Sequence, residues 1–254
     1  MKECIDILWR NGLGNQLFQY TYGKILAKKH NIDLTYSGIG RGCTVSLLEY
    51  GLIKEPKDII KKSSNHSTKT YIDYNRQQGV ELENPHFYKK YITEIKNFFP
   101  KIEKTNTKDL VVHLRLGDNG PNIHTPFEWY KKAIEDNNIE FENLYLITDG
   151  SNSEDAIKFK KHYNAIIPSL VDVKTQSDWA GYIDETIYDF NFIRKFDKIL
   201  FSNSTFSWWA SVLSNASEIY FNNEWQPNHH NGIIKLGQTD YNNFRGICPF
   251  SLKD

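Results

Sequence analysis

The sequence predicts an α/β fold with parallel sheets and right-handed crossovers. The first supporting observation is a strand–turn–helix–strand pattern at the N-terminus. The second is a regular alternation of short apolar runs and amphipathic segments after residue 108. Such alternation indicates strands joined by helices, a connection that is right-handed in almost all parallel sheets. At 254 residues the chain can bury the core of one large domain or of two small ones.

The N-terminal pattern begins with the apolar run Ile5–Trp9, which we predict as a buried strand. The glycine turn Arg10–Asn15 follows, and Gln16–Lys29 then carries apolar residues at helical spacing. Ile32–Tyr36 is a second strand candidate and completes a β-α-β unit. The glycines would let a ligand approach the backbone closely, but a tight strand-to-helix turn explains them equally well.

The middle of the chain, residues 38–108, shows no clear period. We expect three features there: a polar loop at Lys61–Lys69, a helix at Tyr91–Phe99 stopped by Pro100, and a charged linker at Lys101–Lys108. This linker divides the chain into a predicted N-terminal domain, 1–107, and a predicted C-terminal domain, 108–254.

The region after the linker has a regular pattern. We predict strands at Leu110–Leu114, Leu144–Thr148, Ala165–Ile167, Lys198–Ser202 and Glu218–Asn222. We predict helices at Phe127–Asn137, Ser153–Tyr163, Trp179–Lys195 and Phe206–Ser214. In parallel sheets of this kind ligands bind at the carboxyl ends of the strands, so we expect functional residues at those ends.

Charge and composition narrow the class of partner. Lys plus Arg and Asp plus Glu both number 31, and this balance argues against a nucleic acid as the main partner. The three cysteines are far apart and indicate neither a disulfide framework nor a zinc site. No secretory signal and no apolar run of membrane-spanning length is recognisable, so we expect a cytoplasmic protein.

The segment Asn203–Leu213 is the most informative part of the chain. Hydroxyls at Ser204, Thr205 and Ser207 cluster where a helix is predicted to begin, directly after a predicted strand. A helix N-terminus carries unpaired N–H groups and positive dipole charge, so it favours an anion such as a phosphate. An ordinary N-capped core helix is the equally weighted alternative.

Ionisable residues gather at the end of the predicted strand Leu110–Leu114. Alternation along the strand places His113 and Arg115 on one face, and Asp118 follows them. Arginine suits a diphosphate because its planar fork donates two hydrogen bonds and keeps its charge. A simple Arg–Asp surface pair is the alternative. At the next strand end, Asp149 either binds a ligand or starts a turn.

Signatures of other chemistries are missing from the sequence. No Asp-x-Asp pair is present, so the usual carboxylates of a sugar-nucleotide metal site are lacking. No HExxH spacing and no G-x-S-x-G turn occurs either. We therefore predict neither a metal site nor a bound cofactor.

Taken together and in this order, these segments resemble the GDP-fucose-dependent α-1,2-fucosyltransferases of glycosyltransferase family 11. The matching segments are Gly12–Tyr20, His113–Asp118, Trp129–Ile134, Thr148–Asp149 and Asn203–Trp209. The resemblance implies a GT-B-like fold, in which two Rossmann-like domains with parallel sheets face a donor cleft. It also implies metal-independent, inverting transfer of L-fucose from GDP-L-fucose to a sugar hydroxyl, α-1,2 on a galactose-type acceptor.

The resemblance also implies roles for individual residues. Arg115 would bind the donor diphosphate and act in catalysis, while His113 and Asp189 would face the guanine. Gly14 and Asn15 would close on the phosphates, and the implied phosphate ligands at the helix start are Ser204, Thr205 and Ser207. The implied partners are the nucleotide sugar and a glycan acceptor, without nucleic acid or a transmembrane segment. Peripheral association with a membrane and the oligomeric state stay open.

One departure from the family pattern keeps alternatives open. Family members usually have two adjacent arginines, whereas this chain has Leu116 at the second position. Another GDP-deoxysugar is therefore an alternative donor, and an inactive GDP- or glycan-binding module is an alternative of a different class. The proton acceptor for the attacking hydroxyl is Asp118 or, as a second choice, Glu128. Asp118 could equally be a structural partner of Arg115.

Overall fold

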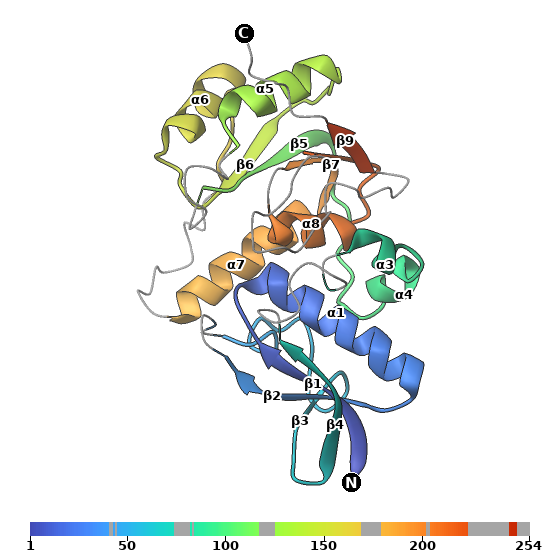
Figure 1. The fold of residues 1–254 in the computed structure, drawn as a ribbon. Coiled ribbons are helices and arrows are strands. Elements are labelled where there is room, and N and C mark those ends of the chain that lie inside the picture. The colour runs from blue at the N-terminus through green and yellow to red at the C-terminus, as the bar shows by residue number, and fades with distance from the viewer. Residues whose placement is uncertain are drawn as a thin grey trace. The chain divides into compact units, whose positions relative to one another are not determined.

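The structure is a computed structural model. It describes residues 1–40, 43, 45–73, 82, 84–116, 125–168, 179–201, 204–222 and 244–247, with backbone only for 179–184 and 244–247. The chain divides into two compact units: the first comprises Met1–Lys101, and the second begins at Ile102. Each unit is built on its own parallel sheet (Figure 1). The predicted α/β class with parallel sheets is therefore confirmed.

The first unit carries a four-stranded sheet in the order β3-β2-β1-β4. Its strands are β1 (Lys2–Trp9), β2 (Asp33–Ile39), β3 (Ile60–Lys61) and β4 (His66–Asp73), and every described pair is parallel. Because β2 and β4 flank β1 on opposite sides, the chain reverses its direction across the sheet at the β1/β4 pair. The described helices of this unit are α1 (Leu13–His30), α3 (Pro85–Lys89) and α4 (Ile92–Lys96).

Helix α1 packs closely along one face of this sheet (Figure 1). Gly23 makes the approach feasible, because a Cβ atom there would lie 2.9–3.1 Å from the terminal methyl groups of Leu34, Ile72 and Ile7. These three residues come from β2, β4 and β1, so the helix spans the centre of the sheet. The predicted β-α-β unit at the N-terminus is confirmed.

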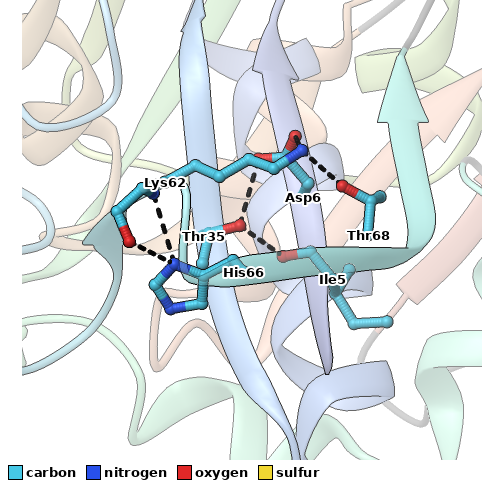
Figure 2. Close-up of polar contacts among 7 residues, drawn as sticks. Ile5, Asp6, Thr35, Lys62, His66 and Thr68 are labelled. Atoms are coloured by element: carbon cyan, nitrogen blue, oxygen red, sulfur yellow. Dashed lines mark hydrogen bonds and ion pairs between the residues drawn. The ribbon is translucent and has the colours of Figure 1, made fainter. Parts of the chain in front are cut away.

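A polar network lies in the interior of the first unit (Figure 2). Asp6 of β1 is fully buried and accepts hydrogen bonds from Thr35 Oγ1 at 3.0 Å and from Lys62 Nζ at 3.1 Å. Lys62 also donates to Thr68 Oγ1 on β4. Lys62 belongs to the connection between β3 and β4, which form opposite edges of the sheet, so its ammonium group ties that connection to the central strand. A buried carboxylate needs such partners, because an unpaired one is strongly destabilising.

The second unit carries a five-stranded sheet in the order β6-β5-β7-β8-β9. The strands are β5 (Asn106–Leu114), β6 (Leu144–Thr148), β7 (Phe196–Phe201), β8 (Glu218–Asn222) and β9 (Phe244–Ile247), all paired in parallel. Ile166 adds an isolated parallel bridge to Tyr145 beyond β6. If the bridge at Ile166 is counted as a strand, the second unit has six strands, which can be numbered 1 to 6 along the chain. Their order across the sheet is then 3-2-1-4-5-6, the strand order of a Rossmann sheet.

Helices cover both faces of the second sheet. Leu110, Val112 and Leu114 of β5 pack in one hydrophobic cluster with residues of α5 (Phe127–Asp136) and α6 (Glu154–Tyr163). On the other face, His113 contacts α8 (Thr205–Val212). Tyr145 packs against Phe192 of α7 (Trp179–Ile193), with ring centroids 5.7 Å apart. Alternate residues of the strands thus meet different helix layers, as period-two patterning predicts.

Three predictions for the middle of the chain are wrong in part. The predicted polar loop Lys61–Lys69 includes the last residue of β3 and the start of β4. Strand β4 is an edge strand with one neighbour, and polar side chains such as Lys69 are tolerated there, so the apolar pattern is weak. The predicted linker Lys101–Lys108 ends inside β5, which starts at Asn106. The predicted helix Tyr91–Phe99 contains α4, which spans five residues.

The division between the units, at Lys101 and Ile102, lies at the start of the predicted linker. The functional division into 1–107 and 108–254 stays a prediction. None of the described helices combines the length and apolar character that crossing a membrane requires.

Candidate functional site

The second sheet has a topological switch point between β5 and β7. These strands are neighbours, but the chain leaves β5 toward β6 on one side and continues from β7 toward β8 on the other. Ligands of open α/β sheets bind in the crevice that such a reversal opens at the carboxyl ends of the strands. Strand β5 ends at Leu114, directly before Arg115, and β7 ends at Phe201, shortly before α8. The two strongest sequence motifs therefore meet at this edge.

Helix α8 presents its N-terminus at this edge of the sheet. Ser204 is its N-cap and accepts a hydrogen bond from the backbone N–H of Ser207 at 3.4 Å. The first turn contains no acidic side chain, so its positive end is not neutralised from within the helix. Ser204 is buried and Thr205 is half-buried. The predicted capped helix start is confirmed, and phosphate binding there stays a prediction.

Two tryptophans hold the start of α8 in place. Trp208 and Trp209 are both fully buried, and their rings meet edge to face with centroids 5.0 Å apart. Burying two such large side chains where the first turn of the helix meets the second restricts how the helix can shift. The interpretation of both residues as packing rather than ligand contacts agrees with their burial.

His113 lies almost fully enclosed on the face of β5 that meets α8. Its Nδ1 and the hydroxyl of Ser207 are 2.5 Å apart, and its ring packs against Phe206 with centroids 5.5 Å apart. Burial, aided by the positive charge of Arg115, lowers the pKa of His113 to about 3. The imidazole is therefore neutral at physiological pH and serves as a hydrogen-bonding group rather than a charge.

Arg115 is held by Asp149, which follows the neighbouring strand β6. Its Nη1 donates to Asp149 Oδ2 at 2.6 Å, and the backbone N–H of Leu116 donates to Asp149 Oδ1 at 2.9 Å. Asp149 thus contacts both the guanidinium of Arg115 and the backbone directly after β5. Both side chains are about one-third exposed, so the pair faces solvent at the carboxyl edge of the sheet. The Arg–Asp pair that the sequence left open exists in the structure, and it is formed with Asp149.

Asp189 lies on α7, which packs against α8. The neighbouring Phe190 meets Phe206 edge to face with centroids 5.4 Å apart, and Phe206 in turn contacts His113. Burial, with a smaller contribution from the negative charge of Glu185, raises the pKa of Asp189 to about 7. Neither of these causes is a positive side chain of the described residues, and carboxyl groups perturbed by burial are common at functional sites.

Gly14 and Asn15 belong to the turn between β1 and α1 in the first unit. Asn11 adopts a left-handed backbone conformation with φ 59° before the Gly12 N-cap. Gln16 and Gln19 hold this turn from the inside, because their amides donate to the backbone oxygens of Asn11 and Arg10 at 2.9 and 3.0 Å. The turn follows the central strand at a second switch point, which fits a ligand contact there.

An ion pair that the sequence did not reveal lies at the carboxyl ends of β1 and β4. Arg10 forms a two-pronged pair with Asp73 at the end of β4, with N–O distances of 3.0 and 3.1 Å. Gly40 lies against the guanidinium, since a Cβ atom there would come within 2.5 Å of it. A correct strand prediction for β4 would have revealed this pair, because β4 lies parallel to β1 and ends with Asp73 close to Arg10.

Of the two proposed proton acceptors, the structure describes Glu128 alone. Asp118 lies outside the described residues. Glu128 lies in the first turn of α5, where its half-exposed carboxylate is 3.4 Å from Lys158 Nζ.

Among the residues that the structure describes, no group of three or more His, Cys, Asp or Glu side chains could hold a metal ion.

Comparisons with known proteins give similarity at the level of fold. No protein-family model matches the chain, and neither does any curated protein. A crystal structure of NodZ α-1,6-fucosyltransferase soaked with GDP-fucose aligns with 90% of this chain and 98% of its own, at 11% identity and a TM-score of 0.47. A structure of selenomethionine fucosyltransferase NodZ from Bradyrhizobium aligns over the same shares, at 10% identity and a TM-score of 0.48.

Proposed function

We propose that this protein is an inverting glycosyltransferase that moves L-fucose from GDP-L-fucose to a sugar hydroxyl of a glycan. The observation that carries the proposal is the meeting of Arg115, His113 and the start of α8 at one switch point of the second sheet. The sequence resemblance to family 11 supports GDP-L-fucose as the donor and an α-1,2 linkage to a galactose-type acceptor.

The proposed reaction breaks the bond between C1 of the sugar and the β-phosphate oxygen, whose electrons pass to the departing GDP. The acceptor hydroxyl attacks C1 from the opposite face and loses its proton to a base, for which Asp118 stays our first choice. Negative charge that builds on the diphosphate needs positive and N–H groups already in place. Arg115, oriented by Asp149, and the N–H groups at the start of α8 are suited to that task.

The nucleobase end of the donor would meet neutral groups. His113 offers a ring nitrogen, and Asp189 offers a carboxyl group that can lose its proton when a ligand donates to it. Guanine carries one oxygen acceptor beside two N–H donors on its pairing edge, so a histidine donor and a carboxylate acceptor complement it.

A different GDP-deoxysugar is the second candidate donor, and Leu116 favours it. This side chain packs toward Gly150, where a Cβ atom would come within 2.6 Å of its Cδ1. An arginine in its place would bring a second positive charge, so this chain offers one charged group fewer here than the family pattern does.

A donor panel tests the proposed function. Calorimetry with GDP-L-fucose, GDP-mannose, UDP-galactose and GDP should give binding of the guanine nucleotides alone. A transfer assay with galactose-terminated acceptors should then give fucosylated product without added metal. Equal binding of UDP-galactose would contradict the nucleotide assignment. Binding of GDP-L-fucose without transfer or hydrolysis across a broad acceptor set would instead favour an inactive binding module.

Proton release on donor binding tests Asp189. At pH 6.5 the free carboxyl is largely protonated, because its pKa is raised to about 7. Guanine N–H donors favour the carboxylate, so binding should lower the pKa and release up to one proton. At pH 8.5 the carboxyl is already ionised, and the release should vanish. Calorimetry of GDP-L-fucose binding in two buffers of different ionisation enthalpy measures the proton count.

GDP-L-fucose is the suitable ligand for this measurement because its diphosphate is esterified at both ends and has no ionisation near pH 6. The Asp189→Asn variant cannot ionise and is the control, for which we expect no release at either pH. A proton count at pH 6.5 that is the same in the variant and the parent protein would remove Asp189 from the base-binding site.

A further inference from the structure

The hydroxyl of Ser207 points into the protein rather than toward a ligand. Ser207 lies in the first turn of α8 and is fully buried. Its backbone N–H is already bonded to the Ser204 side chain. Its hydroxyl lies 2.5 Å from His113 Nδ1, across 94 positions of sequence. The contact joins the two strongest sequence motifs of the chain by a single hydrogen bond.

The available hydrogen-bond acceptors determine whether Ser207 or His113 donates the proton in this contact. Within the described part of the chain, the Ser207 hydroxyl has His113 Nδ1 as its one acceptor. If Nδ1 carried the proton, the buried hydroxyl proton would have no acceptor there, which is unfavourable. The hydroxyl therefore donates to Nδ1. Because the imidazole is neutral, its own proton then resides on Nε2.

We propose that Ser207 is a positioning residue that fixes His113 in the neutral tautomer with its proton on Nε2. Phe206, which packs against the ring, limits rotation of the imidazole. Within the described residues Nε2 has no hydrogen-bond partner, so its N–H is available to an acceptor atom of a bound ligand. The inference about ligand binding rests on the proposed function, in which a carbonyl oxygen of the nucleobase is that acceptor. The tautomer itself does not depend on any ligand.

The tautomer can be measured in the ligand-free protein. Long-range ¹⁵N–¹H correlation spectra of the ¹⁵N-labelled chain distinguish protonated from unprotonated ring nitrogens. The chain contains eight histidines, so signals missing from a His113→Gln spectrum assign His113. We expect an unprotonated Nδ1 and a protonated Nε2. A protonated Nδ1 in the parent protein would overturn the proposal without any variant.

Variants of the serine test whether its hydroxyl is the cause. Ser207→Ala should give a mixture of tautomers and raise the Kd for GDP roughly three- to tenfold, the range that one hydrogen bond represents. Ser207→Thr keeps the hydroxyl and should keep the parent tautomer. Ser211→Ala is a matched control, because Ser211 is equally buried one turn further along α8 and its hydroxyl has no partner within the described residues.

The outcomes separate this proposal from the proposed function. Unchanged His113 signals in Ser207→Ala would overturn the positioning role, whatever the protein binds. Failure of the parent protein to bind any guanine nucleotide, with the expected tautomer present, would overturn the proposed function alone. If Ser211→Ala altered the His113 signals as strongly as Ser207→Ala, general disturbance of α8 would explain both effects and the positioning role would be wrong.

Discussion

Replacement of Arg115 by alanine is expected to lower kcat of fucosyl transfer by about 10²–10³-fold, because one charged donor to the departing diphosphate is lost. The fold should survive, since the Arg115 side chain is about one-third exposed and its partner Asp149 stays in contact with solvent. Initial-rate measurements with GDP-L-fucose, together with thermal unfolding, test both statements.

Two control variants sharpen this experiment. Arg115→Lys keeps the positive charge but loses the planar fork, so its rate should lie between those of the alanine variant and the parent. Lys160→Ala removes a positive charge from an exposed position of α6 and should leave the rate unchanged. Full activity of Arg115→Ala would show that the diphosphate is neutralised elsewhere and would remove the central residue of the proposed site.

Replacement of Trp208 by alanine is expected to lower the free energy of unfolding by about 3–5 kcal/mol, the usual range for a large aromatic residue deleted from a core. Trp208 is fully buried and packs edge to face against Trp209. The lost packing and the remaining cavity both contribute to the expected loss. Urea denaturation followed by circular dichroism gives the free energy, provided that both proteins unfold in one step.

Matched variants test whether burial is the cause of that loss. Trp208→Phe keeps an aromatic ring and should lose less stability than the alanine variant. Ile157→Ala shortens a side chain that is 40% exposed on α6, so its effect should stay within about 0.5 kcal/mol. A loss below about 1 kcal/mol in Trp208→Ala would mean that the start of α8 is not held by this packing.

Much of the second sheet could be predicted from the sequence because its strands are short apolar runs between amphipathic helices. Strand β6 has the predicted bounds Leu144–Thr148, and β8 has the predicted bounds Glu218–Asn222. The first unit was harder to predict. Strand β4 carries polar residues at an edge, and Asp6 is an acidic residue inside a central strand. Their stabilising partners, such as Lys62, lie elsewhere in the chain.

The sequence by itself determined most strands and helices of the second unit and which motifs stand at strand ends, because periodicity and capping depend on neighbouring residues. It did not predict β9, and the predicted strand Ala165–Ile167 is a single bridge at Ile166. The sequence also placed His113 and Arg115 at the end of one predicted strand, and Ser207 at a predicted helix start that follows another. Only the tertiary structure decided their partners: Asp149 for Arg115, 34 positions away, and Ser207 for His113, 94 positions away. Those contacts follow from strand order, since β5 lies between β6 and β7 and brings both loops to its end. At the start of α8, the Ser204 cap could therefore be predicted from neighbouring residues, whereas the contact of Ser207 with His113 depends on the strand order of the sheet.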